Sequence, residues 1–312
     1  MLLAIVPATS LATYPGRNGL IAYTGSERSS SGSRLEIFTI PPAGGSPTRL
    51  THNNRPDTSP AWSADGGKIA FVRSDGYRNH KSAVWIMQAD GHKQHLVTRP
   101  GFDPYFSPGG GRIVFTLPHS IATVGLGGDN LRRVVLGSRI RSIGNPRYSP
   151  DGKRIAFDGV PKGNDVNPSI WIVHADGSHL RRVTRPPQKY GYDEGPDWRP
   201  DGRRLIFLHS DCNERGCEQA VYSVRADGSR QRRIAGASYS GVYSPTGNRA
   251  ALYFLGWDTI YQNVRCADVF TITAPKRSDR RAVTHNCPHG VVDPTRFTGI
   301  AAGPNWQPLP RG

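Results

Sequence analysis

Ten polar or ionisable residues stand next to short apolar segments, where they could bind a ligand. They are Arg55, Asp57, Asp103, His119, Arg141, Asn145, Tyr192, Asp193, His209 and Asp293. Several Asp oxygens that converge on one point suit a hard cation, so a calcium site is one interpretation. The alternative is that these Asp side chains cap turns and accept backbone N–H groups ahead of each strand.

Local motifs of the common enzyme classes are missing from the sequence. It contains no Gly-x-Ser-x-Gly, no His-Glu-x-x-His and no phosphate-binding loop that ends in Gly-Lys-Ser or Gly-Lys-Thr. A hydrolase or lyase whose Asp and His residues come from separate repeats would leave no such motif. That class therefore stays open, with or without a metal.

The elements that must position the candidate residues form a repeat with a period of about 45 residues. Each repeat unit has an aromatic residue, a tight turn and then a β-branched or apolar strand that opens with Lys or Arg. The turns are Trp62–Gly66, Phe106–Gly110, Tyr148–Gly152, Trp198–Gly202 and Tyr243–Gly247. Repetition of strands at this period predicts an all-β fold, a β-propeller of four-stranded antiparallel blades.

The two ends of the chain together supply one further blade. Residues 304–308 resemble a first strand, residues 18–23 a second, and residues 35–40 and 48–51 a third and a fourth. A blade shared in this way closes the ring and hides its open edges. The sequence therefore predicts a single six-bladed propeller over residues 13–312, with most Trp side chains packed between blades.

The repeated aromatic-Ser-Pro-Asp-Gly turn, followed by a strand led by Lys or Arg, resembles the WD-repeat-like blades of TolB-type propellers. The resemblance covers about residues 16–310 and implies the six-bladed fold. TolB carries an α/β domain ahead of its propeller, whereas the blades of this chain begin almost at once. For this reason no role in the Tol–Pal system is inferred from the resemblance.

The tight turns and the longer connections of a propeller must lie on opposite faces. The longer connections are residues 73–82, 99–104, 137–146, 158–168, 185–196, 208–219, 255–267 and 284–304. Variable loops on a rigid scaffold often carry binding residues. We therefore expect the binding surface on the long-loop face, around the mouth of the central channel.

Residues 1–12 resemble the apolar core and small-residue end of a signal peptide, although the positive n-region is missing. This favours export to the periplasm, the cell envelope or the medium. Nothing else in the sequence is long and apolar enough to span a membrane.

The sequence holds four cysteines, an even number that predicts two disulfides in an exported protein. The expected pairs are Cys212–Cys217 and Cys266–Cys287. A zinc site that uses the first pair with His209 is the rival interpretation, but its spacing is poor for zinc.

The formal net charge is +16 at pH 7, so anionic partners should be attracted in a salt-dependent way. Nucleic acid is disfavoured because no recognition helix, zinc finger or RNA-binding motif is present. We expect an exported, monomeric, non-catalytic propeller without a cofactor that binds a protein or an anionic cell-envelope polymer. The alternative is a hydrolase or lyase at the channel mouth.

Overall fold

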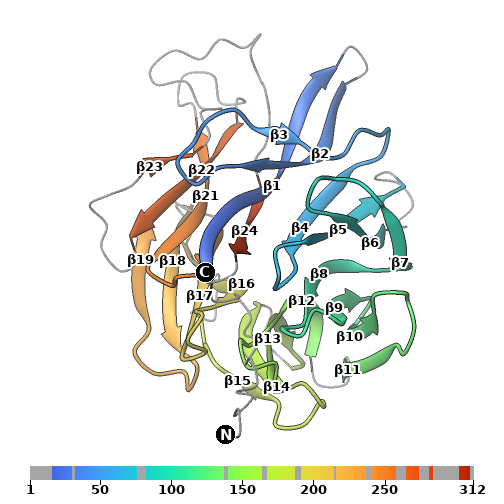
Figure 1. Cartoon of the computed structure of the whole chain (residues 1–312). Coiled ribbons are helices and arrows are strands. Elements are labelled where there is room, and N and C mark those ends of the chain that lie inside the picture. The colour runs from blue at the N-terminus through green and yellow to red at the C-terminus, as the bar shows by residue number, and fades with distance from the viewer. Residues whose placement is uncertain are drawn as a thin grey trace, which may run out of the picture.

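The computed structural model describes residues 16–29, 32–75, 82–136, 140–163, 167–186, 191–213, 216–236, 240–257, 265–273, 281–283 and 302–309. Within these ranges the regular structure is entirely β, arranged as six antiparallel four-stranded sheets around a common centre (Figure 1). The predicted all-β propeller with six blades is confirmed.

Six blades follow one another in chain order. Blade 1 is β24 (Ala302–Leu309), β1 (Arg17–Ser29), β2 (Gly32–Ile40) and β3 (Thr48–Arg49). Blade 2 is β4 (Asp57–Trp62), β5 (Lys68–Ser74), β6 (Ser82–Gln88) and β7 (His95–Thr98). Blade 3 is β8 (Phe102–Phe106), β9 (Arg112–Leu117), β10 (Ser120–Gly125) and β11 (Arg132–Leu136).

The second half of the chain repeats this order. Blade 4 is β12 (Ile140–Tyr148), β13 (Arg154–Pro161), β14 (Ser169–His174) and β15 (Arg181–Arg182). Blade 5 is β16 (Tyr192–Trp198), β17 (Arg204–Asn213), β18 (Gly216–Arg225) and β19 (Arg232–Gly236). Blade 6 is β20 (Ser240–Tyr243), β21 (Arg249–Trp257), β22 (Arg265–Thr273) and β23 (Arg281–Ala282).

The ring closes through blade 1, as the sequence predicts. The last strand, β24, pairs with the first, β1, with Trp306 opposite Ile21. Asn305 Oδ1 accepts the backbone N–H of Trp62 in blade 2 at 2.8 Å, and Trp306 Nε1 donates to the carbonyl oxygen of Gly19 at 3.1 Å. Residues from the two ends of the chain therefore hold blade 1 together and join it to blade 2.

In blades 2 to 6 the repeated turn is closed by backbone hydrogen bonds at the same positions. In the turn after β12, the hydroxyl of Ser149 donates to Asp151 Oδ1 and accepts the N–H of Arg154, while Asp151 Oδ1 also accepts the N–H of Lys153. Gly152 has a φ of 69°, which only Gly adopts without steric cost. The turn after β20 keeps this shape although Thr246 replaces Asp, because its hydroxyl lies 3.0 Å from that of Ser244.

The core lies between neighbouring blades. The aromatic residue at the end of each innermost strand is buried: Trp62, Phe106, Tyr148, Trp198, Tyr243 and Trp306. A second buried layer comes from Phe71, Phe115, Phe157 and Phe207, each in the second strand of its blade. These side chains explain the spacing of aromatic residues in the sequence, and they support the prediction that Trp residues pack between blades.

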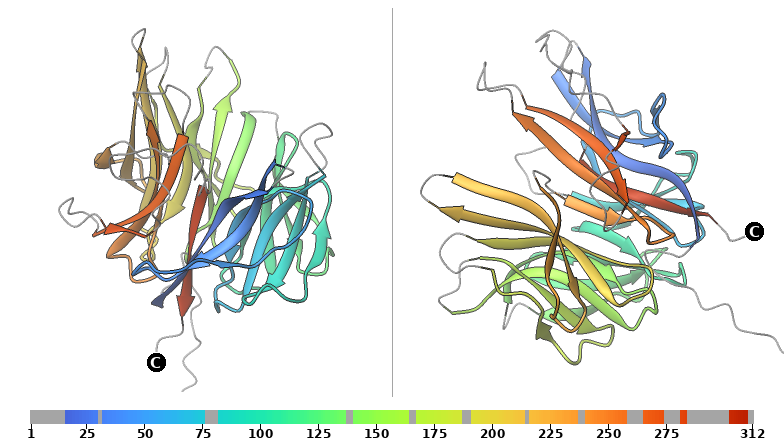
Figure 2. Two further views of the ribbon diagram at one scale, coloured as in Figure 1. Left: turned by 90° about the horizontal axis from the view of Figure 1, so that it is seen from above. Right: turned by 90° about the vertical axis from the view of Figure 1, so that its left-hand side faces the viewer.

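Several connections predicted as loops are strand instead. Residues 208–213 and 216–219 continue β17 and β18 as a hairpin, residues 255–257 and 265–267 extend β21 and β22, and residues 140–146 belong to β12. Figure 2 shows the β17–β18 and β21–β22 hairpins projecting from one side of the ring, while β24 ends on the other. Paired backbone hydrogen bonds stiffen these extensions in a way that loop composition does not reveal.

Candidate functional site

A bulge recurs in four of the innermost strands and shapes the long-loop end of the ring. It places Ser59, Asp103, Asn145 and Gly195 at φ values of 53°, 47°, 50° and 61°. Each is followed by Pro, which stands two residues before the buried aromatic residue. The strand register shifts at each of these positions, so one extra residue is inserted without breaking the blade.

The bulges turn backbone N–H groups towards the neighbouring blade. The N–H of Ser59 donates to Thr24 Oγ1 of β1 at 3.2 Å. The N–H of Gly195 donates to Asp158 Oδ2 of β13 at 2.8 Å, and that of Asn145 makes a longer bond of 3.5 Å to Asp103 Oδ2 of β8. These bonds stitch successive blades together around the central axis.

Three carboxylates from successive blades gather at this end of blades 3, 4 and 5. We call Asp103, Asp158 and Glu194 the acidic cluster. Asn145 connects two of them, because its Nδ2 donates to Asp158 Oδ2 at 2.8 Å while its backbone N–H contacts Asp103. Asp158 is buried, whereas Asp103 and Glu194 are half-buried. The cluster is thus a partly accessible negative site on a protein of strongly positive charge.

The environment favours the neutral form of two of these acids. The pKa of Asp158 is raised to about 7, chiefly by burial and in addition by the nearby carboxylates of Glu194 and Asp103, while hydrogen bonds from Gly195 and Asn145 oppose the shift. Burial also raises the pKa of Glu194. Asp158 therefore titrates near neutral pH, and the charge of the cluster depends on pH.

Asp57 and Arg55 each form an ion pair in blade 2, but with different partners. Asp57 is fully buried and accepts Nε and Nη2 of Arg73, both at 2.7 Å, as well as Asn53 Nδ2 at 2.7 Å. Arg55 is exposed and pairs with Asp75 at 2.8 Å. Asp57 therefore serves the structure of its blade, through side-chain partners and not through the backbone N–H groups that the capping interpretation expects.

Asp193 and His209 form a close pair in blade 5. They face each other across β16 and β17, and Nδ1 of His209 lies 2.6 Å from Asp193 Oδ1. Asp193 is buried, and its Oδ2 has no hydrogen-bond partner among the described residues. The His209 ring packs against Tyr222 with centroids 4.5 Å apart. A carboxylate that holds Nδ1–H in this way fixes the tautomer and leaves Nε2 as the basic nitrogen.

The remaining predicted site residues lie apart from these groups or outside the described part of the chain. Tyr192 accepts a hydrogen bond at its hydroxyl from Gln219 Nε2 in the β17–β18 hairpin. His119 is exposed in the β9–β10 turn, and Arg141 is exposed in β12. Asp293 lies outside the described residues.

Metal-binding geometry is not found in the described ranges. No group of three or more His, Cys, Asp or Glu side chains there is placed to hold a metal ion. Asp57, Asp158 and Asp193 instead bond to Arg, Asn, His or backbone N–H groups.

The strand register bears on one of the two expected disulfides. Cys212 in β17 and Cys217 in β18 are direct partners across the hairpin. Positions that face each other on antiparallel strands have Cα separations within the range of a disulfide, so this pairing stays a prediction that the register allows. Cys266 lies in β22, whereas Cys287 is outside the described residues, and their pairing remains untested.

Sequence reasoning did not select Asp158 or Gly195 as site residues. Asp158 lies in an apolar second strand, and its neighbours in the sequence give no sign that it is buried beside two other acids. A local signal for the bulges does exist. Pro60, Pro104, Pro146 and Pro196 each stand two residues before the repeat's aromatic residue.

Comparison with known proteins gives partial matches. No protein-family model matches the chain. Atu1656 of Agrobacterium fabrum is 27% identical over 270 residues, which are 80% of this chain and 80% of that protein. The Tol-Pal system protein TolB of Francisella tularensis is 32% identical over 133 residues, which are 41% of this chain but only 30% of that TolB.

Solved structures show which fold this chain shares with known proteins. TolB from Acinetobacter baumannii superimposes with a TM-score of 0.72 at 20% identity, covering 93% of this chain and 67% of that one. The chain therefore shares the β-propeller fold of TolB. An oligogalacturonate lyase in complex with manganese has a TM-score of 0.55 at 13% identity, covering 89% of the TolB-like propeller and 88% of the lyase, which shows a shared fold. Among the described residues of the TolB-like propeller, no helix of the length and apolarity needed to cross a bilayer is found.

Proposed function

We propose that this TolB-like propeller is an exported, non-catalytic protein that binds a protein partner through its long-loop face. The acidic cluster carries the proposal. Asp103 and Glu194 are half-buried and come from different blades, so their spacing is fixed by the ring rather than by a flexible loop. Such a site is suited to a Lys or Arg side chain, or a terminal amine, of a partner.

Export is part of the same proposal. It is supported by the signal-peptide character of residues 1–12 and by the similarity to the Tol-Pal system protein TolB of Francisella tularensis. An anionic cell-envelope polymer is the other partner class, and the net charge of +16 favours it. Polymer binding would depend on the Arg-rich surface and not on the acidic cluster.

The test is capture of partners from an envelope extract by wild type and by a D103N/E194Q variant. Loss of two charge-assisted contacts should weaken capture of a protein partner by about ten-fold or more. The matched control is D90N/D227N, which removes two exposed carboxylates from the tight turns on the opposite face. Equal capture by all three proteins would contradict the acidic cluster as the binding site. Capture that survives in both variants but disappears at high salt would indicate the polymer.

A second candidate function has its own observation, the Asp193–His209 pair. A His held by a buried carboxylate can act as a general base, and the shared fold with oligogalacturonate lyase suggests an anionic polysaccharide as the first substrate class to assay. We propose to assay β-elimination of oligogalacturonate with and without manganese, for wild type and H209Q. Activity that H209Q abolishes would support this function. No turnover by the wild type, or turnover that H209Q retains, would exclude it.

A further inference from the structure

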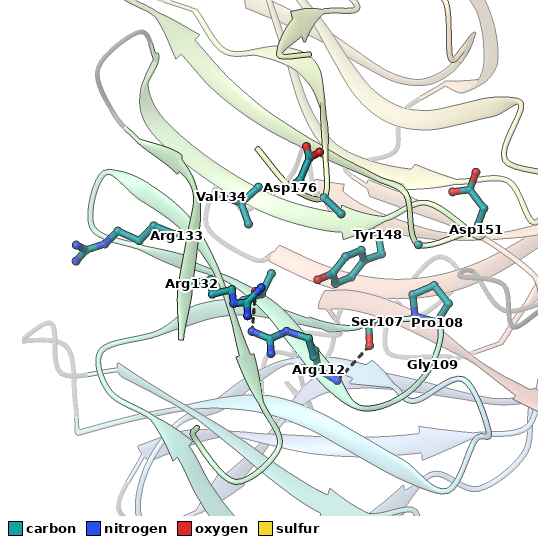
Figure 3. Close-up of a pocket in the computed structure, with 13 residues that line it drawn as sticks. Ser107, Pro108, Gly109, Arg112, Arg132, Arg133, Val134, Tyr148, Asp151 and Asp176 are labelled. Atoms are coloured by element: carbon teal, nitrogen blue, oxygen red, sulfur yellow. Dashed lines mark hydrogen bonds between the residues drawn. The ribbon is translucent and has the colours of Figure 1, made fainter. Parts of the chain in front are cut away.

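A cavity of about 560 Å³ opens between blades 3 and 4 (Figure 3). Residues of the tight turns line it, and no residue of the acidic cluster does. Its walls include Arg112, Thr123 and Arg132 of blade 3 and Tyr148 of blade 4. The volume lies within the range of small-molecule sites. None of the functions considered above uses these residues.

The corresponding space between blades 4 and 5 is crossed by arginine side chains. Arg154, the first residue of β13, stacks over Trp198 with its guanidinium carbon 4.7 Å from the ring centroid, and its Nη2 donates to the carbonyl oxygen of Gly202 at 3.1 Å. Arg181 at the start of β15 reaches the carbonyl oxygen of Ala226 in the next blade. Both arginines thus donate hydrogen bonds to backbone carbonyl oxygens of the facing blade.

The equivalent arginines of blade 3 do not cross. Arg112, the first residue of β9, directs its Nη2 back to Thr123 Oγ1 at 3.0 Å and to the carbonyl oxygen of Asn130 at 2.7 Å. Its Nε and Nη1 have no hydrogen-bond partner among the described residues, and neither does the guanidinium of Arg132. Guanidinium groups with unused N–H donors therefore line this cavity.

The facing wall adds a neutral donor. Tyr148 takes the place that Trp198 holds in the next blade, and Figure 3 shows its hydroxyl directed towards the side chains of Arg112 and Arg132. Burial raises the pKa of Tyr148 to about 12, although Arg112 and Thr123 oppose the shift, so the hydroxyl keeps its proton at neutral pH.

The acidic residues at the rim are occupied elsewhere. Asp151 Oδ1 accepts the Ser149 hydroxyl at 2.6 Å, and Asp176 Oδ1 accepts the N–H of Ser178 at 2.8 Å. In Figure 3 both carboxylates point away from Arg112 and Tyr148, and Arg133 extends away from the cavity as well. The interior therefore presents donors and positive charge.

We propose that this cavity binds the phosphate group of a small phosphorylated ligand, held by the guanidinium groups of Arg112 and Arg132 and by the hydroxyl of Tyr148. Arginine forks match phosphate oxygens, and a tetrahedral phosphate has enough acceptors for donors on both walls. The volume beyond the phosphate accommodates an organic portion of sugar size. The phosphate can belong to a free metabolite or to a lipid headgroup.

Calorimetric titration with glucose 6-phosphate tests the proposal, with glucose as the ligand control and constant ionic strength throughout. Vesicles that contain phosphatidic acid form a second arm, compared with vesicles of phosphatidylcholine alone. We expect saturable binding to wild type in at least one arm, and the arm that binds identifies the source of the phosphate. Y148F and R132Q should each weaken that binding by about ten-fold or more, since each removes a hydrogen bond to a charged group.

R203Q is the matched control, because Arg203 is an exposed turn residue on the same face in blade 5. It loses the same charge as R132Q and should bind as wild type does. Melting temperatures confirm that each variant is folded, and Y148F preserves the packed ring. The proposal is overturned if folded wild type shows no binding up to about 10 mM in either arm, or if R203Q weakens binding as much as R132Q.

Discussion

Asp57 and Arg73 form a bidentate pair in which Asp57 is fully buried and the Arg73 guanidinium lies over the rings of Phe71 and Trp85. R73Q would leave the Asp57 carboxylate without its cation, so we expect a loss of about 3–5 kcal/mol in the free energy of unfolding. Chemical denaturation measures it. R55Q removes an exposed partner of Asp75 and should cost less than about 1 kcal/mol. Equal effects of the two substitutions would contradict the structural role of Asp57.

Asp158 makes stability depend on pH near neutrality. Its pKa is raised to about 7 in the folded chain, whereas an Asp in the unfolded chain titrates near about 4. The folded state therefore holds the proton more tightly, and the stability gained from it is complete below pH about 4 and lost as the pH rises through about 7. We expect the melting temperature of wild type to fall, relative to that of D158N, between about pH 5 and pH 8. Parallel profiles for the two proteins would refute this assignment.

At the scale of elements, the bulges in the inner strands determine which backbone N–H groups and side chains face the neighbouring blade. Asn145, which precedes Pro146 in β12, combines a φ of 50° with a side-chain hydrogen bond to Asp158. N145G relieves the left-handed backbone but loses the amide, whereas N145A loses the amide and keeps the strain. We expect both variants to be less stable than wild type, with N145A the less stable by about 1 kcal/mol. Thermal unfolding of the three proteins gives the order of stability. An N145A variant as stable as wild type would contradict this role of the bulge.

The strands and turns could be predicted because their signals are local and repeated. Trp62, Phe106, Tyr148, Trp198 and Tyr243 marked the inner strands, and all five are buried where the repeat places them. Asp103 was among the predicted site residues, but the acidic cluster as a whole could not be predicted, because its members come from three blades and meet only through the ring. The length of the β17–β18 hairpin was also hidden, since Cys, Asn and Asp there look like loop residues until their pairing partners are known.

At the scale of the whole molecule, blade 1 depends on strands from both ends of the described chain. Removing residues 301–312 deletes β24, which exposes one edge of β1 and the faces of blades 2 and 6 that β24 contacts. We expect the truncated chain to associate or unfold, as measured by light scattering and thermal unfolding. Adding a peptide of residues 301–312 should restore part of the monomer. A truncated chain that remains monomeric and melts as wild type does would contradict the closure of the ring.

The pairing of β24 with β1 also has a consequence during synthesis. When the ribosome has synthesised the strands of blades 2 to 6, the inner edge of β1 is still unpaired. Its partner, β24, emerges after all of these strands. Translation of 312 residues takes tens of seconds, at roughly 5–20 residues per second. Until β24 emerges, the nascent protein exposes an unpaired strand edge, to which a chaperone or a second nascent copy could bind.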